Sequence, residues 1–206
     1  REWTVRTSVH TLKGVARQVN LLEPEQVKEY LARAQITEGR KERITYDLIR
    51  FYKWKDLQFQ PPRFRRIERL PFIPTEEELV SLISAVNQKL SCFLQLLKET
   101  GARAGEAWNA TWTDIDSERM IINITPEKNS RPRPARISGK LLAMLNAQQK
   151  LGKHVFHEDN VDSIDTLCHM RRTFEKARKK LAQKLQNPRL QQITFKTFRH
   201  WKATME

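Results

Sequence analysis

The residues best suited to chemistry on an anion are four cations and one carboxylate, which lie in three separate segments. Arg103 and Glu106 belong to the heptapeptide TGARAGE, Lys128 lies between two apolar runs, and Lys196 and Arg199 are three residues apart near the end of the chain. A guanidinium offers a fixed fork of donors and stays charged, so two of them can neutralise the non-bridging oxygens of a phosphate. A lysine can protonate a departing oxygen.

Arg103 is positioned by a predicted helix end. An apolar run at helical spacing, residues 90–97, precedes Gly101, where a glycine favours a left-handed helix C-cap. Arg103 then lies just past the helix, and Glu106 is close enough to hold it. An ordinary helix–turn–helix connection with a structural Arg–Glu pair also fits this heptapeptide, because turns bounded by glycine are common.

The other cations are placed by a hairpin and a late helix. Strand-like runs at 114–116, 120–124 and 135–137 predict a small antiparallel sheet, with Lys128 in the turn between the last two. Arg131 and Arg133 make the tip of that turn basic. The segment 193–204 predicts a helix, on which a spacing of three puts Lys196 and Arg199 on one face.

The chain is strongly basic throughout its length. It has 38 Lys and Arg residues against 24 Asp and Glu residues, a net charge of +14. Residues 1–70 hold 16 basic and 9 acidic residues, so each part of the chain carries +7. That balance favours a polyanionic partner such as DNA. Two cysteines within apolar segments, no signal-peptide pattern and no apolar run of about 18 residues predict a cytoplasmic protein.

The chain divides at a linker rich in proline and arginine. Residues 9–57 predict three or four helices, whose basic residues, Lys41 and Arg43 among them, lie away from the apolar stripe. Prolines stiffen the next stretch, and Arg63, Arg65 and Arg66 suit a strap along a phosphate backbone, although an ordinary surface loop also fits. The predicted boundaries are a helical domain at 1–60, a linker at 61–73 and a second domain at 74–206.

The second domain is predicted to be mostly helical as well. Thr75 and Glu78 form a capping-box pattern before an apolar stripe at helical spacing. Long helices are predicted at 139–151 and 164–185, the second with a very basic outer face. The fold class is therefore mainly α with a small antiparallel β-sheet, an α+β protein.

A metal site is the weaker interpretation of the histidines. His154 and His157, with Cys168 and His169, match no standard zinc spacing, and Cys168 and His169 would lie on a helix. No carboxylate cluster suits two Mg²⁺ ions. We predict no metal and no cofactor.

Three features in this order resemble the tyrosine recombinases, the family of phage and plasmid integrases and Xer-like proteins. Thr100-Gly101-x-Arg103-x-Gly105-Glu106 is similar to the family's first arginine box, and Lys128 matches its β-hairpin lysine. Lys196-x-x-Arg199-His200 matches the second box, with lysine where histidine is more usual. The resemblance covers nearly the whole chain.

The resemblance implies a helical core-binding domain that binds DNA and a catalytic domain. It implies a site-specific recombinase that cleaves and rejoins double-stranded DNA through a 3′-phosphotyrosyl intermediate, assembled as a tetramer during synapsis in the host nucleoid. The catalytic residues would be Arg103, Lys128, Lys196 and Arg199, with Glu106 orienting Arg103. The residues expected to contact DNA are Lys41, Arg43, Arg63, Arg65, Arg66, Arg131 and Arg133.

The family's nucleophile is a tyrosine downstream of the second box. The tyrosines of this chain, Tyr30, Tyr46 and Tyr52, all lie in the first helical unit, and seven residues follow Arg199. We therefore expect a recombinase cut short before its nucleophile, which binds DNA without cleaving it. The rival interpretation is a non-catalytic basic module for DNA or RNA with structural arginines. Convergence of the four cations on one phosphate-sized spot would distinguish the two.

Overall fold

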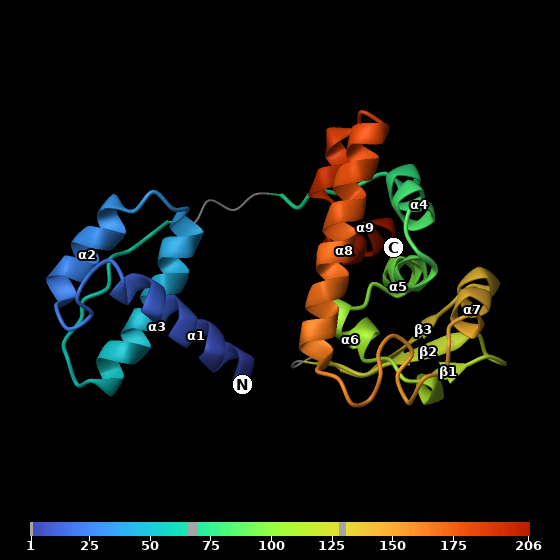
Figure 1. Cartoon of the computed structure of the whole chain (residues 1–206), viewed down its shortest axis with the longest axis horizontal. Coiled ribbons are helices and arrows are strands. Elements are labelled where there is room, and N and C mark those ends of the chain that lie inside the picture. Colours follow the sequence, from blue (N-terminus) through green and yellow to red (C-terminus); the bar gives the residue numbers. More distant parts are fainter. Residues whose placement is uncertain (1, 66–69, 128–130) are drawn as a thin grey trace. The chain divides into compact units, whose positions relative to one another are not determined.

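A computed structural model of the chain describes residues 2–65, 70–127 and 131–206 (Figure 1). The chain forms two units, Arg1–Leu70 (unit 1) and Pro71–Glu206 (unit 2), each with its own hydrophobic core. The division between them falls inside the segment predicted as a linker. The DNA-binding role of unit 1 and the catalytic role of unit 2 stay predictions.

Unit 1 consists of helices α1 (Glu2–Ala16), α2 (Pro24–Arg33) and α3 (Glu38–Trp54). Proline stands at the start of α2, as predicted, because its missing N–H has no helical partner there anyway. Helix α1 begins before residue 9, where the sequence predicts the start of the helical unit. In its first turns Val5 and Val9 are exposed, so these turns add little to the core of unit 1.

Unit 2 begins with α4 (Glu76–Ser84) and α5 (Gln88–Thr100). The predicted capping box at α4 is confirmed: the backbone N–H of Glu78 donates to the Thr75 hydroxyl at 3.2 Å, and the Thr75 N–H donates to the Glu78 carboxylate at 2.9 Å. Helix α5 is the centre of the core, because most of its residues from Leu90 to Leu97 are fully buried.

A three-stranded antiparallel sheet supplies one side of unit 2. Its strands β1 (Ile115–Asp116), β2 (Ile121–Ile124) and β3 (Arg133–Arg136) follow in the order β1-β2-β3. Pro134 lies in β3, at the edge of the sheet, where a residue without an N–H is tolerated. The helix after the sheet, α7 (Gly139–Asn146), is shorter than predicted. The prediction of a mainly helical fold with a small antiparallel sheet is confirmed.

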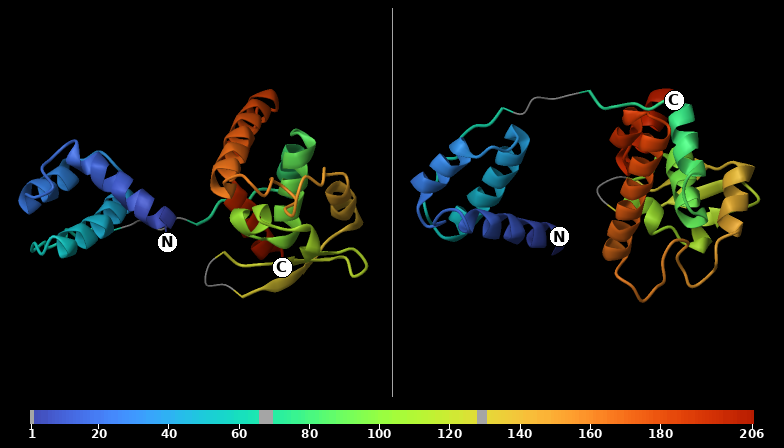
Figure 2. Two further views of the ribbon diagram at one scale, coloured as in Figure 1. Left: turned by 60° about the horizontal axis from the view of Figure 1, so that its bottom comes forward. Right: turned by 45° about the horizontal axis from the view of Figure 1, so that its top comes forward.

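The remaining elements of unit 2 contribute residues to the same hydrophobic core. They are the short helix α6 (Ala104–Trp108), the 3₁₀ turn η1 (Trp112–Asp114), the long helix α8 (Ser163–Lys184), the 3₁₀ turn η2 (Pro188–Gln192) and α9 (Phe195–Met205). Helix α9 lies between α5 and α8 (Figures 1 and 2), where Phe195 packs edge-on to Phe93 and stacks on Phe174. The end of α5 and the start of α9 are thereby brought together. None of the described helices is long and apolar enough to cross a lipid bilayer.

Candidate active site

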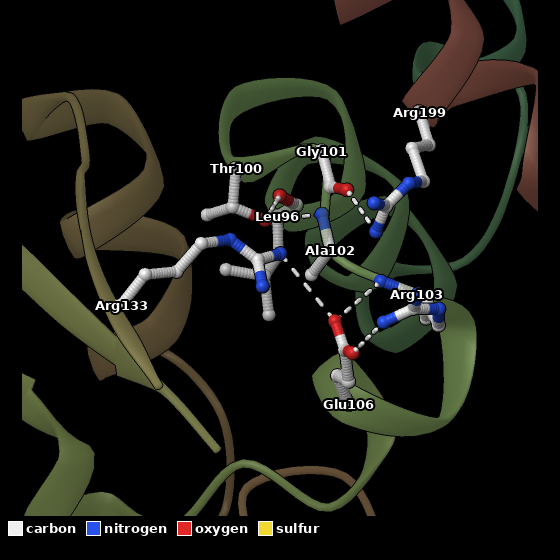
Figure 3. Close-up of polar contacts among 8 residues, drawn as sticks. All are labelled: Leu96, Thr100, Gly101, Ala102, Arg103, Glu106, Arg133 and Arg199. Atoms are coloured by element: carbon white, nitrogen blue, oxygen red, sulfur yellow. Dashed lines mark hydrogen bonds and ion pairs between the residues drawn. The ribbon is translucent and has the colours of Figure 1, made fainter. Parts of the chain in front are cut away.

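The turn that bears Arg103 is tightly fixed. Gly101 ends α5 with a φ of +58°, the left-handed conformation predicted for it, and its N–H donates to the Leu97 carbonyl at 3.0 Å. The Thr100 hydroxyl donates to the Leu96 carbonyl at 2.7 Å and accepts the N–H of Ala102 at 3.2 Å (Figure 3). Arg103 is the next residue and directly precedes α6, so its side chain leaves the backbone between two helices.

Glu106 holds Arg103 at two points. Its side chain is fully buried, and its Oε1 accepts from Arg103 Nη1 at 2.6 Å. Its Oε2 accepts the backbone N–H of Arg103 at 3.0 Å and Nη2 of Arg133 at 3.4 Å (Figure 3). A glutamate three residues into a helix can reach the N–H of the residue before it, which explains the spacing in the sequence.

The surroundings of Glu106 favour its charged form. Burial raises the pKa of this carboxyl, but the hydrogen bonds from Arg103 and the charges of Arg133 and Arg103 outweigh burial. The pKa of Glu106 therefore lies below its ordinary value. The buried carboxylate stays ionised beside the two arginines.

Replacing Glu106 by Gln is expected to destabilise unit 2 by about 1.5–3 kcal/mol near neutral pH, the range for hydrogen bonds to charged groups. Because the folded pKa is depressed, this stabilisation is present above the unfolded pKa of about 4.3 and is lost as pH falls through the folded pKa. The urea midpoints of the two proteins should therefore approach each other as pH falls below about 4.3. Glu118→Gln, at an exposed glutamate, is the matched control and should show no such convergence. A Glu106→Gln difference that is independent of pH would contradict the prediction.

Arg199 contacts the turn that precedes Arg103. Its Nη1 donates to the carbonyl oxygen of Gly101 at 3.4 Å, and its side chain is half-buried (Figure 3). Lys196, one turn earlier on α9, is exposed. Arg103, Lys196 and Arg199 all line one cavity of about 680 Å³. Three of the four cations predicted to converge are thus brought together, and the fourth, Lys128, lies outside the described residues.

Four more charged residues line the same cavity. They are Glu127, Arg171, Glu175 and Arg178. The sequence placed Arg171 and Arg178 on the basic face of α8 without linking them to the site. Arg171 and Arg178 are seven residues apart, which is two helical turns, and this spacing could have shown that they share one face of the helix. The Arg178 Nη1 donates to the carbonyl of Ile193, two residues before α9, so α8 also helps to place the start of α9.

Gly105 allows a close approach of chain segments at the cavity. A Cβ at position 105 would meet the carboxylate of Glu127, so a larger residue there would require the end of the Glu127 side chain to move. Gly105 thus lets Glu127 lie close to the backbone of α6.

The profile of the phage integrase family matches residues 74–205. The chain belongs to the phage integrase family. The resemblance to tyrosine recombinases is thereby confirmed for the part of the chain that holds Arg103 and Arg199. A comparison with curated protein sequences finds no match.

Solved integrase structures share the fold. The integrase of transposon Tn1549, in complex with transposon right end DNA, is 14% identical with a TM-score of 0.68, over 98% of this chain and 80% of that one. A lambda integrase dimer bound to a COC′ core site is 14% identical with a TM-score of 0.66, over 99% and 82%. XerA recombinase is 19% identical with a TM-score of 0.51, over 100% and 78%.

The predicted DNA-contacting residues of this integrase-family chain differ in accessibility. Arg43, Arg63, Arg65 and Arg131 are exposed, and Arg66 lies outside the described residues. Lys41 is only 8% exposed. Its ammonium lies 3.3 Å from Glu38 and over the Phe64 ring. Sequence spacing could not reveal that Phe64, beyond α3, would cover Lys41, and the proposed DNA surface therefore leaves Lys41 out.

The histidines that suggested zinc contact other groups in the integrase fold. The rings of His154 and His157 stack with centroids 4.2 Å apart. His154 Nδ1 lies 2.7 Å from Asp159 Oδ1, and His157 Nδ1 lies 2.8 Å from the Glu158 carbonyl. In residues 2–65, 70–127 and 131–206, no three His, Cys, Asp or Glu side chains gather in a metal-binding arrangement.

Proposed function

We propose that this chain is the DNA-binding and phosphate-activating part of a site-specific recombinase of the tyrosine type. The observation that carries the proposal is the convergence of Arg103, Lys196 and Arg199, from α5–α6 and α9, on one cavity. Family membership and a net charge of +14 give further support.

The cavity suits a phosphodiester under attack. As the phosphorane forms, charge grows on its two non-bridging oxygens, and Arg103 and Arg199 are proposed to neutralise it with preorganised donors. Glu106 keeps the Arg103 guanidinium in place, so little reorganisation is needed during the reaction. Lys196 adds a third cation, and Lys128 is proposed to protonate the departing 5′ oxygen.

The proposed nucleophile is a tyrosine outside the 206 residues. Tyr30, Tyr46 and Tyr52 lie in α2 and α3 of unit 1. None of the cavity cations can attack phosphorus at neutral pH, because a cation has no free electron pair to donate. Covalent catalysis requires an attacking group about 3–3.5 Å from phosphorus and in line with the leaving oxygen.

The proposed partners are double-stranded DNA and further copies of the chain. One solved structure that shares the fold is a lambda integrase tetramer bound to a Holliday junction. We propose a tetramer on the recombination site, in the cytoplasm of the host cell. Arg43, Arg63, Arg65, Arg66 and Arg131 are proposed to contact the DNA backbone.

A covalent-trapping experiment tests this function. The 206-residue chain first selects its preferred duplex from a random-sequence pool, and that duplex is rebuilt as a nicked suicide substrate. The 206-residue chain is expected to bind it without a covalent product. The same chain extended by its tyrosine-bearing segment is expected to give a protein–DNA species that survives a denaturing gel.

Three outcomes would overturn the proposal. A covalent band from the 206-residue form would mean that another residue is the nucleophile. Selective binding with no covalent species from the extended form would favour a DNA-binding module with structural arginines. Selection of RNA over duplex DNA from a mixed pool would point to an RNA-binding module instead.

A further inference from the structure

We propose that Arg133 is a positioning residue of the phosphate site, because it contacts the buried carboxylate that holds Arg103. The sequence predicts a DNA contact for Arg133, as for Arg131. In the structure, Nη2 of Arg133 lies 3.4 Å from Oε2 of Glu106 (Figure 3). The part that Arg133 plays in strand cleavage rests on the proposed function, whereas its effect on Glu106 does not.

The backbone of Arg133 is held by the sheet. Arg133 is the first residue of β3 and pairs with Ile124, the last residue of β2, while β3 also contacts α5. Ile124 is buried in the core of unit 2. The Arg133 side chain is half-buried and starts from a fixed strand end, so its guanidinium reaches Glu106 at a small entropic cost compared with a loop residue.

Arg133 shares a carboxylate oxygen with the backbone of Arg103. Oε2 of Glu106 accepts from both Arg133 and the Arg103 N–H, while Oε1 accepts from the Arg103 guanidinium. A rotation of the carboxylate would disturb all three contacts together. Arg133 therefore restrains the orientation of Glu106, and Glu106 in turn restrains Arg103.

Charge gives Arg133 a second effect on the site. Glu106 is fully buried, so solvent screens its negative charge poorly, and that charge offsets part of the attraction of Arg103 for a phosphate. The Arg133 guanidinium lies against this carboxylate and offsets part of its negative charge. Removing Arg133 would leave more of the Glu106 charge to oppose the attraction of Arg103 for a phosphate.

The test compares Arg133→Ala with Arg136→Ala. Both variants remove one arginine from β3, but Arg136 is exposed and does not line the cavity, so it serves as the matched control. The pKa of Glu106, followed by carbon NMR of labelled carboxyl groups, is expected to rise in Arg133→Ala and to stay unchanged in Arg136→Ala. The Arg103 Nε–H signal should shift in the first variant only. Arg133→Lys, which keeps the charge, should restore most of the Glu106 pKa.

Kinetics give an independent readout in the extended chain with its tyrosine. Arg133→Ala is expected to lower the single-turnover cleavage rate by about 10- to 100-fold, the range for partners of directly acting groups, with nearly unchanged DNA affinity. Arg136→Ala should leave the rate at saturation unchanged. Urea unfolding of each variant confirms that the folded proteins are being compared.

The outcomes separate the two proposals. An unchanged Glu106 pKa and Arg103 signal in Arg133→Ala would overturn the positioning role, whatever the chain catalyses. Altered signals with an unaltered cleavage rate would overturn it as well. If the extended wild-type chain forms no covalent species, the proposed function fails, and the NMR result still decides whether Arg133 positions Glu106.

Discussion

Arg199→Ala is expected to slow formation of the covalent protein–DNA species by about 100- to 1,000-fold in the chain that carries its tyrosine. This is the usual effect of removing one preorganised donor from a developing oxyanion. Duplex binding should weaken much less, because a single phosphate contact is a small part of the total. Single-turnover rates on the nicked duplex measure the first effect, and gel-shift titration measures the second.

A charge-matched control distinguishes catalysis from general electrostatics. Arg172 is exposed on α8 and does not line the cavity, so Arg172→Ala should change binding and leave the rate at saturation unchanged. Arg199 also donates to the Gly101 carbonyl, and losing that hydrogen bond should cost about 1 kcal/mol of stability. Urea unfolding checks that cost. A loss of binding as large as the loss of rate would contradict a role in the transition state.

DNA affinity is expected to fall by about 1,000- to 100,000-fold between 50 and 200 mM salt, if the chain neutralises roughly 6–10 phosphates. Each half of the chain carries +7, so both are expected to release counterions. The measurement is the slope of the logarithm of affinity against the logarithm of salt concentration. It compares the whole chain with residues 71–206, which have their own hydrophobic core.

The shorter piece should show a clearly shallower slope. If residues 71–206 keep the full slope, unit 1 does not bind the phosphate backbone, and the DNA contacts proposed for unit 1 are wrong. A triple substitution of Arg63, Arg65 and Arg131 by Gln gives a second test with the whole chain. It should reduce the slope by up to about three, roughly one for each phosphate contact removed.

Features set by local rules could be predicted from the sequence. The Thr75–Glu78 capping box, the left-handed Gly101 and the reach of Glu106 back to Arg103 each depend on fewer than five consecutive residues. For these, backbone geometry leaves few alternatives. The shared helical face of Lys196 and Arg199 could be predicted for the same reason, because residues three apart are neighbours on a helix.

Features set by tertiary packing could not be predicted in this way. Nothing in the spacing of Lys41 shows that Phe64 covers it, and nothing near Arg133 identifies Glu106 as its partner. Arg171 and Arg178 belong to a face of α8 with many basic residues, and only the packing of α8 beside α9 selects these two for the cavity. A basic side chain has the same sequence signature whether it faces solvent, DNA or a buried carboxylate.

The turn at the end of α5 has a consequence for how such a protein can vary. Arg103 directly follows this turn, and Nη1 of Arg199 donates to the Gly101 carbonyl within it. The distance between the two guanidinium groups therefore depends directly on the three residues Gly101 to Arg103, in addition to the contacts that hold α9 against α5. Exposed loops in that interval, such as residues 158–162, could lengthen at small entropic cost without moving either arginine. A single residue inserted between Gly101 and Arg103 would separate them, so natural variation in length should spare this turn.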